Sequence, residues 1–135
     1  MTRPAGQVIL WQDFVPGASL GEITQFFDAA LSRAWQGIFG ADAAGTCAEG
    51  AGIAVAMMMR GYLGVVAPRP PGNVHARQRF TLEALPAPGE AIRTQVTCLG
   101  KEMRRERRYV DLGVRGSGDA GRAIYHGVLT LIWAA

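Results

Sequence analysis

The sequence predicts an α+β fold in which an antiparallel β-sheet wraps around one buried helix. Residues 49–66 are apolar on every side rather than along one stripe, which is typical of a helix enclosed by protein. From residue 74 to the C-terminus, alternating apolar and polar stretches are separated by short turns, which is typical of antiparallel strands. The apolar helix is too short to span a bilayer, which needs about 20 apolar residues.

The N-terminal part adds two further predicted elements. Residues 8–11 are a short apolar run and predict a first strand. Ser19 and Glu22 have the spacing of a helix capping box, and apolar residues at helical spacing follow, so an amphipathic helix is predicted over residues 19–38. The apolar set of this helix is Ile23, Phe26, Phe27, Ala30, Leu31, Ala34, Trp35 and Ile38.

The buried helix and the strands follow in order. Thr46 and Glu49 repeat the capping-box spacing and predict where the buried helix begins, while a glycine at 64 and a proline at 68 predict its end. Strands are predicted over residues 74–85, 91–99, 109–115 and 123–133. Two of them alternate clearly, with one face formed by Ile92, Thr94, Val96 and Cys98 and another by Val110, Leu112 and Val114. Because no repeat or linker interrupts the pattern, residues 1–135 are expected to form one domain.

Composition and charge narrow the class of protein. A hydrophobic fraction of 49% with 19% charged residues is ordinary for a globular domain. The net charge of +3 is modest and predicts neither nucleic acid nor a membrane as partner. Cys47 and Cys98 lack the neighbouring ligands of a zinc site, and the first residues do not form a secretory signal. A cytoplasmic protein with free thiols is therefore expected.

Four short stretches carry a resemblance to a known family. They are GNVHARQRF (72–80), PAPGEAI (86–92), RRYV (107–110) and DAGRAI (119–124). The order of a helix, a buried helix and long antiparallel strands is that of the hot-dog fold. From Ala51 onward the chain resembles the MaoC-like dehydratase/hydratase family, in which a Pro-x-x-Gly-Asp/Glu turn precedes a strand.

This resemblance implies a homodimer acting on an acyl thioester, either acyl-CoA or an acyl-carrier thioester. The implied reaction is hydration of a 2-enoyl thioester or the reverse dehydration, with coenzyme A as part of the substrate and with neither a metal nor a redox cofactor. One feature departs from the family. Its hydratases carry an Asp, four residues and then a His before the buried helix, whereas here Asp42 has Cys47 at that spacing.

Hydration of an enoyl thioester needs groups that polarise the thioester carbonyl. The backbone N–H groups of Gly50, Ala51 and Gly52 lie at the predicted start of the buried helix, where unpaired N–H groups favour an oxyanion. Glycine also lets a ligand approach the backbone closely. The alternative interpretation is that these glycines only permit tight packing of the helix against the sheet.

The reaction also needs groups that carry protons, and three residues are candidates. Asp42 has the chemistry to activate water or to stabilise a turn. Glu49 is a helix-capping residue by its spacing, and some hot-dog thioesterases use an acidic residue near this position as nucleophile or base. His75 begins a strand that, in a hot-dog dimer, can approach the ligand cleft of the partner. Its alternative is a surface or interface histidine.

The charged run at residues 101–108 holds five basic and two acidic residues. Arg104 and Arg105 are candidates to bind the phosphates of coenzyme A or of a phosphopantetheine arm, and the alternative is a solvated hairpin tip. Three functions stay open at this point: a hydratase or dehydratase, a thioesterase that uses Glu49, and a non-catalytic acyl-thioester-binding subunit.

Overall fold

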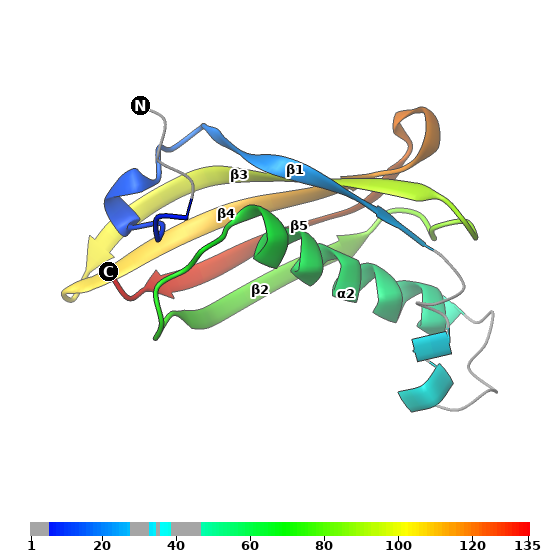
Figure 1. Cartoon of the computed structure of the whole chain (residues 1–135), viewed down its shortest axis with the longest axis horizontal. Coiled ribbons are helices and arrows are strands. Elements are labelled where there is room, and N and C mark those ends of the chain that lie inside the picture. Colours follow the sequence, from blue (N-terminus) through cyan, green and yellow to red (C-terminus); the bar gives the residue numbers. More distant parts are fainter. Residues whose placement is uncertain (1–5, 28–32, 35, 39–46) are drawn as a thin grey trace.

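A computed structural model of the chain describes residues 6–27, 33–34, 36–38 and 47–135, with side chains from residue 50 onward in the long helix. One long helix lies against one sheet, and the sheet curves around it (Figure 1). In chain order the elements are η1 (Trp11–Asp13), β1 (Ser19–Phe26), α2 (Cys47–Val65), β2 (Val74–Leu82), β3 (Ala91–Arg104), β4 (Arg107–Ser117), η3 (Asp119–Gly121) and β5 (Ala123–Trp133).

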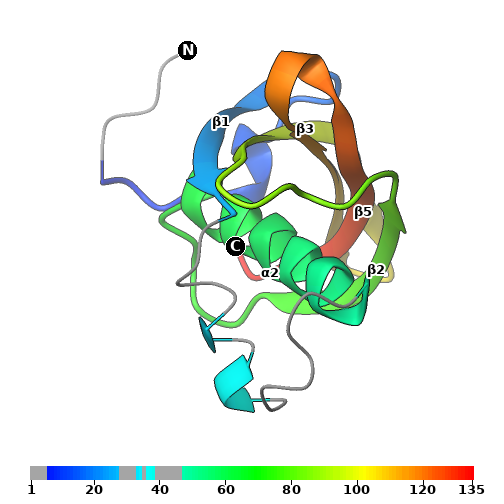
Figure 2. The same cartoon turned by 90° about the vertical axis from the view of Figure 1, so that its right-hand side faces the viewer.

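The five strands form a single antiparallel sheet in the order β1-β3-β4-β5-β2. Seen end-on, the sheet curls around α2 and encloses it on the concave side (Figure 2). The core lies between this concave face and the helix. Its largest fully buried side chains include Phe14, Met57, Met58, Ile92, Leu112, Tyr125, Leu129 and Trp133. The predicted α+β hot-dog arrangement is therefore confirmed.

The predicted helix over residues 19–38 is wrong in its first part, because Ser19–Phe26 is strand β1. Alternate residues such as Ile23 and Gln25 are half-buried while Glu22 and Thr24 are exposed, so the segment fits a period of two as well as a helical period. The backbone of this segment forms hydrogen bonds with β3, and this long-range pairing cannot be predicted from the local sequence pattern. Residues 33–34 and 36–38 are helical, and the rest of that prediction lies outside the described residues.

The strand predicted over residues 8–11 is also wrong. The N–H of Ile9 donates to the carbonyl of Pro68, and the chain then enters the short helix η1. The indole of Trp133 donates to the carbonyl of Ile9 at 2.8 Å, and Phe14 packs edge-on against the same indole at 4.9 Å between ring centroids. These apolar residues close one end of the sheet instead of adding a strand to it.

Helix α2 is confirmed as the central element, but it is not buried on all sides. Ile53, Ala54, Met57 and Met58 face the sheet and are buried. The opposite side is exposed at Ala56, Arg60, Leu63 and Gly64, because the sheet covers only one side of the helix. Among the described residues, no helix has the length and apolar content needed to cross a membrane.

The four predicted C-terminal strands are confirmed, with shifted ends. The buried positions on β3 and β4 are those that the alternation predicts, from Ile92 to Cys98 and from Val110 to Val114. Both strands continue into the charged run at residues 101–108, so β3 reaches Arg104 and β4 begins at Arg107. Strand β2 ends at Leu82 instead of residue 85.

Gly61 permits the closest contact between α2 and the sheet. A Cβ added there would lie 2.4 Å from Cγ2 of Thr94, which is itself buried. We expect Gly61→Ala to lower the free energy of unfolding by about 1–3 kcal/mol, because overpacking outweighs the gain of about 1 kcal/mol in helix propensity. Gly64→Ala is the matched control, since its Cβ would meet only the end of the Ile23 side chain at 3.3 Å. Urea unfolding of both variants measures the difference, and an equally stable Gly61→Ala would contradict this account of the helix–sheet contact.

Candidate functional site

The N-terminal end of α2 is the first part of the candidate site. Gly50 is buried, whereas Ala51 and Gly52 are half-buried. A Cβ on Gly50 would lie 2.8 Å from Cδ2 of Leu85, in the segment after β2. Gly50 therefore has a packing role, as the alternative interpretation expects. The first N–H groups of a helix lack partners within the helix, so this end of α2 also offers donors. Because α2 begins at Cys47, these donors lie in the turn before Ala51 and Gly52, whose own N–H groups are in the second turn and pair within the helix. The predicted donors are therefore shifted toward the start of the helix.

Two of the three predicted proton carriers have no described side chain. Asp42 lies outside the described residues, and Glu49 is described only as part of the first turn of α2. Both precede Gly50 closely in the chain. Their side chains therefore stay predictions at this site.

The third proton carrier, His75, lies at the other end of the molecule. It is exposed near the start of β2 and pairs with Leu131, a buried residue, so it is on the same face of the sheet as α2. Leu85, which contacts Gly50, follows ten residues later, and an extended chain of that length spans about 30 Å. Within one chain, His75 does not meet the N-terminal end of α2.

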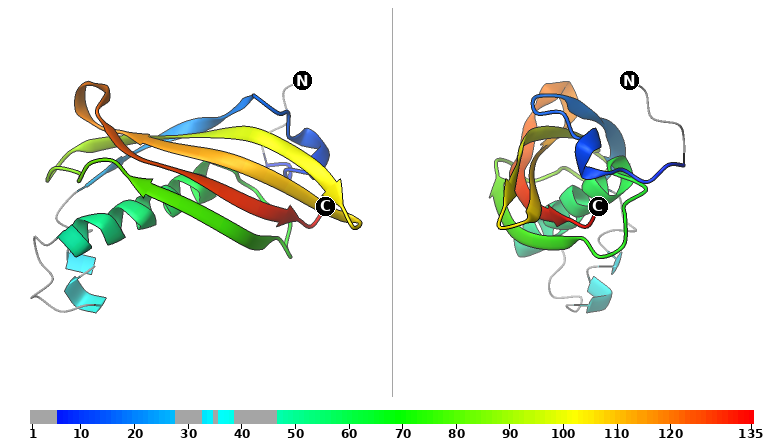
Figure 3. Two further views of the ribbon diagram at one scale, coloured as in Figure 1. Left: turned by 180° about the vertical axis from the view of Figure 1, so that it is seen from behind. Right: turned by 90° about the vertical axis from the view of Figure 1, so that its left-hand side faces the viewer.

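Arg104 and Arg105 lie at the same end of the sheet as His75. The strand register places Val74 of β2 beside Ile132 of β5, and Ile132 beside Tyr109 of β4, close to the β3–β4 turn. Viewed from behind, the β3–β4 turn, the C-terminus and the start of β2 gather at one end, and α2 begins at the other (Figure 3). The predicted site residues therefore divide into two groups at opposite ends of the chain.

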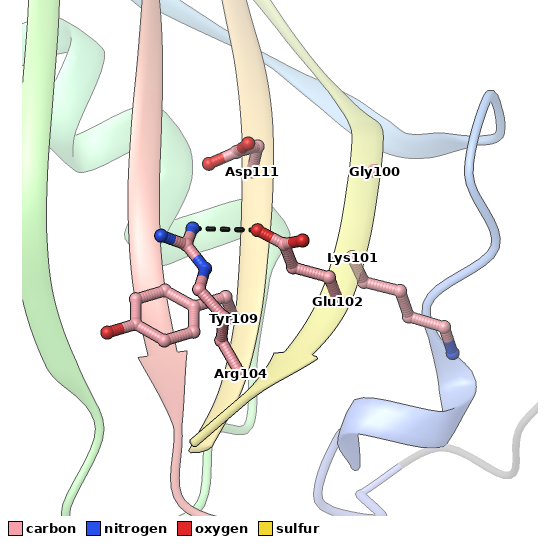
Figure 4. Close-up of a pocket in the computed structure, with 6 residues that line it drawn as sticks. All are labelled: Gly100, Lys101, Glu102, Arg104, Tyr109 and Asp111. Carbon is pink, nitrogen blue, oxygen red and sulfur yellow. Dashed lines mark ion pairs between the residues drawn. The ribbon is translucent and has the colours of Figure 1, made fainter. Parts of the chain in front are cut away.

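A hollow of about 500 Å³ lies beside the β3–β4 turn. It is lined by Arg104, Arg105, Arg107 and Tyr109. A neighbouring hollow of about 240 Å³ is lined by Arg104 and Tyr109 together with Gly100, Lys101, Glu102 and Asp111 (Figure 4). The predicted basic hairpin thus borders two open hollows, while residues 102–107 are exposed, as the alternative of a solvated tip also expects.

A buried network near the start of α2 escaped the sequence analysis. The carboxylate of Glu90 accepts hydrogen bonds from the N–H of Ala87 and of Asp119, each at 2.8 Å, and pairs with Arg122. Burial alone would raise the pKa of Glu90, but these donors and the arginine charge together hold the pKa below its ordinary value. Glu90 therefore stays ionised and fastens the segment after β2 to the β4–β5 connection.

A second buried polar pair joins β3 and β5. The hydroxyls of Thr94 and Tyr125 lie 2.5 Å apart, and both residues are fully buried. Burial raises the pKa of Tyr125, an effect that the hydrogen bond with Thr94 partly offsets. The pair keeps a neutral phenol satisfied inside the core. In the sequence, the alternation of residues 92–98 predicts that Thr94 faces the core. Nothing in the sequence indicates that the hydroxyl of Tyr125 is its partner.

Cys98 is not placed to act as a nucleophile, and the side chains that the structure describes form no metal centre. Cys98 is buried, and its burial raises the pKa of its thiol despite the nearby carbonyl of Gly100 and the charge of Lys101. Within residues 6–27, 33–34, 36–38 and 47–135, no three His, Cys, Asp or Glu side chains converge in a way that would hold a metal ion. His126 contacts Glu83 on the surface.

Comparison with solved structures shows that this chain shares the hot-dog fold. The chain is similar to a MaoC-like dehydratase from Rhodospirillum rubrum, with a TM-score of 0.75 at 16% identity over 93% of this chain and 96% of that one. It is similar to the R-hydratase PhaJ1 from Pseudomonas aeruginosa, with a TM-score of 0.74 at 16% identity over 93% and 86% of the two chains. It is also similar to the 3R-hydroxyacyl-ACP dehydratase complex HadBC from Mycobacterium tuberculosis, with a TM-score of 0.66 at 14% identity over 87% and 96%.

No protein-family model matches the sequence, and no curated protein matches it either. The structural likeness at 14–16% identity shows the fold. The resemblance to the MaoC-like dehydratases is therefore confirmed at the level of the hot-dog fold, and the solved relatives that share this fold include hydratases and dehydratases.

Proposed function

We propose that this protein acts on acyl thioesters as a hydratase or dehydratase of the MaoC type. The observation that supports the proposal is the N-terminal end of α2, which begins at Cys47 and continues into the buried or half-buried residues Gly50, Ala51 and Gly52 beside the sheet. Unpaired N–H groups and the positive end of the helix dipole favour the negative charge that develops on a thioester oxygen. The proton carriers are Asp42 or Glu49 from the same chain and His75.

His75 takes part in this proposal through a second copy of the chain. In the described part of the structure, β2 is an edge strand that pairs with β5 on one side. Unpaired strand edges favour pairing with another strand. If two copies pair antiparallel along β2, the start of each β2 lies opposite the end of the other. His75 of the partner subunit then approaches the end of the sheet where Leu85 contacts Gly50, and the two separated groups of site residues form one composite site.

Thioester hydrolysis is the second candidate, and Glu49 favours it. The residue stands in the first turn of α2, where the helix dipole stabilises a carboxylate. There it would activate water against a carbonyl held by the same helix end. The absence of a histidine five residues after Asp42 favours a third candidate function, a subunit that binds acyl thioesters without converting them.

The test is incubation with saturated and 2-enoyl-CoA thioesters, followed by mass spectrometry. Water addition to the enoyl substrate supports the proposed hydratase, and release of free thiol from the saturated substrate supports hydrolysis instead. Binding without product would assign the protein to the third class. If no thioester is bound or converted, the proposal is wrong.

A further inference from the structure

The β3–β4 hairpin concentrates the net charge of the protein. Residues 101–108 hold five basic and two acidic side chains, an excess of three positive charges. The whole chain has a formal net charge of +3, so the remainder is neutral on balance. A local excess of this kind attracts anions more strongly than the same charge spread over a surface.

The five basic residues divide into two groups by their contacts. Lys101 extends away from Arg104 toward the N-terminal segment (Figure 4), where its ammonium donates to the carbonyl of Trp11 at 3.1 Å and lies over the indole. Arg108 donates to the carbonyl of Ala134 at 3.5 Å. These two side chains thus contact the segment at Trp11 and the segment after β5. The other three, Arg104, Arg105 and Arg107, line the hollow of about 500 Å³.

The turn of this hairpin has two features that are locally unfavourable. Arg104 and Arg107 are directly paired across the strands, and like charges in that position repel each other. Arg105 and Glu106 between them have φ values of +49° and +65°, a conformation that favours asparagine and glycine. Strain and repulsion at one place often accompany a function, because a ligand can offset them.

One arginine of the hollow is already oriented. The guanidinium of Arg104 pairs with Glu102 at 2.7 Å and lies over the ring of Tyr109, 4.6 Å from its centroid (Figure 4). Among the described residues, neither Arg105 nor Arg107 has a carboxylate within ion-pair distance. The hollow thus combines a positioned guanidinium and an aromatic ring with two arginines that make no ion pair among the described residues.

We propose that this hollow binds the adjacent phosphates of a nucleotide, with Arg104, Arg105 and Arg107 as the phosphate ligands. Guanidinium groups bind phosphate oxygens through paired charged hydrogen bonds, and an anion between Arg104 and Arg107 would attract both and so offset their mutual repulsion. Tyr109 and the stacked Arg104 offer a planar surface beside the phosphates. The nucleotide is either the nucleotide part of coenzyme A, a case that rests on the proposed function, or a free nucleotide.

The first experiment measures binding of ADP by isothermal titration calorimetry. The double variant Arg105→Ala with Arg107→Ala is expected to weaken ADP binding by about tenfold or more, since each tenfold loss corresponds to about 1.4 kcal/mol of lost charged contacts. Arg115→Ala is the matched control, because Arg115 is an exposed arginine on β4 away from the turn. Equal weakening in the control, or no binding by the unaltered protein, would overturn the proposal.

A second pair of variants separates the ligand site from the stability of the turn. The double variant Arg105→Asn with Glu106→Gly introduces the residues that positive φ favours, so its melting temperature without ADP should rise. The same variant should lose the further increase that ADP gives to the unaltered protein. Glu106→Gly alone keeps all three arginines and should retain that increase. If the double variant binds ADP as well as Glu106→Gly does, Arg105 is not a ligand.

A third comparison identifies the source of the phosphates. Acyl-CoA and the corresponding acyl-pantetheine differ only in the nucleotide part. If the carrier is coenzyme A, the Arg105→Ala/Arg107→Ala variant binds acyl-CoA more weakly but acyl-pantetheine unchanged. If the ligand is a free nucleotide, the variant loses ADP binding while both thioesters behave alike. Failure of the proposed function is recognised separately, because ADP binding by the hollow needs no turnover.

Discussion

Glu90→Gln is expected to lower the free energy of unfolding by about 3 kcal/mol, the largest loss of stability we expect from a single polar substitution here. Every contact of the Glu90 carboxylate is a donor: the N–H groups of Ala87 and Asp119 and the guanidinium of Arg122. A glutamine must point its own NH₂ group at one of them. The side chain is only 1% exposed, so water cannot replace the lost partner. Urea unfolding at pH 7 measures the effect.

The same substitution should change how stability depends on pH. The pKa of Glu90 is lowered on folding, so its ionisation stabilises the folded protein above the ordinary glutamate pKa of 4.5. That contribution decreases as the pH falls below 4.5 and is lost as the pH passes the lowered pKa. The difference in stability between the unaltered protein and Glu90→Gln should therefore be constant near neutral pH and shrink in acid.

Glu22→Gln is the matched control for this prediction. Glu22 also contacts an arginine, Arg93 at 3.7 Å, but both side chains are about half exposed. Exposed ion pairs contribute at most about 1 kcal/mol, and Glu22→Gln should change stability by about 0.5 kcal/mol or less. If the two glutamine variants are equally stable, the buried network does not fasten the loop as described.

The C-terminal half of the fold was predictable because its pattern has a single interpretation. From Ile92 to Cys98 a period of two has no helical equivalent, and the structure buries those residues. Residues 19–26 differ, because Ile23 and Phe26 satisfy a helical spacing while Ile23 and Gln25 satisfy a strand. The deciding partner is β3, about 70 residues later in the chain.

The candidate site was predictable in its residue types but not in its layout. A glycine-rich helix start and an arginine-rich turn are visible in the sequence, whereas their separation depends on the register of β2, β5 and β4. The Glu90 network depends likewise on Arg122, which is distant in the chain. Charge and hydropathy patterns report local structure, and contacts between distant strands follow from the packing of the whole domain.

Mixing two inactive variants is expected to restore activity if the composite site of the proposed function exists. Glu49→Gln and His75→Ala each remove a proposed proton carrier, and loss of a general acid or base lowers turnover by about 100-fold or more. When the two are unfolded together and refolded in equal amounts, half of the dimers contain one copy of each. Each mixed dimer has one site with both defects and one intact site, so about a quarter of the unaltered activity should return.

The reciprocal mixture distinguishes a composite site from two independent ones. A chain with both substitutions is refolded with an equal amount of unaltered chain. In a composite site, both sites of a mixed dimer carry one defect, so only the unaltered dimers work and about a quarter of the activity is expected. In independent sites, the unaltered half of each mixed dimer also works, and about half should remain. If activity recovers in the first mixture and a quarter of the activity remains in the second, His75 acts in the site of its partner. If no activity recovers in the first mixture and half remains in the second, each site lies within a single chain.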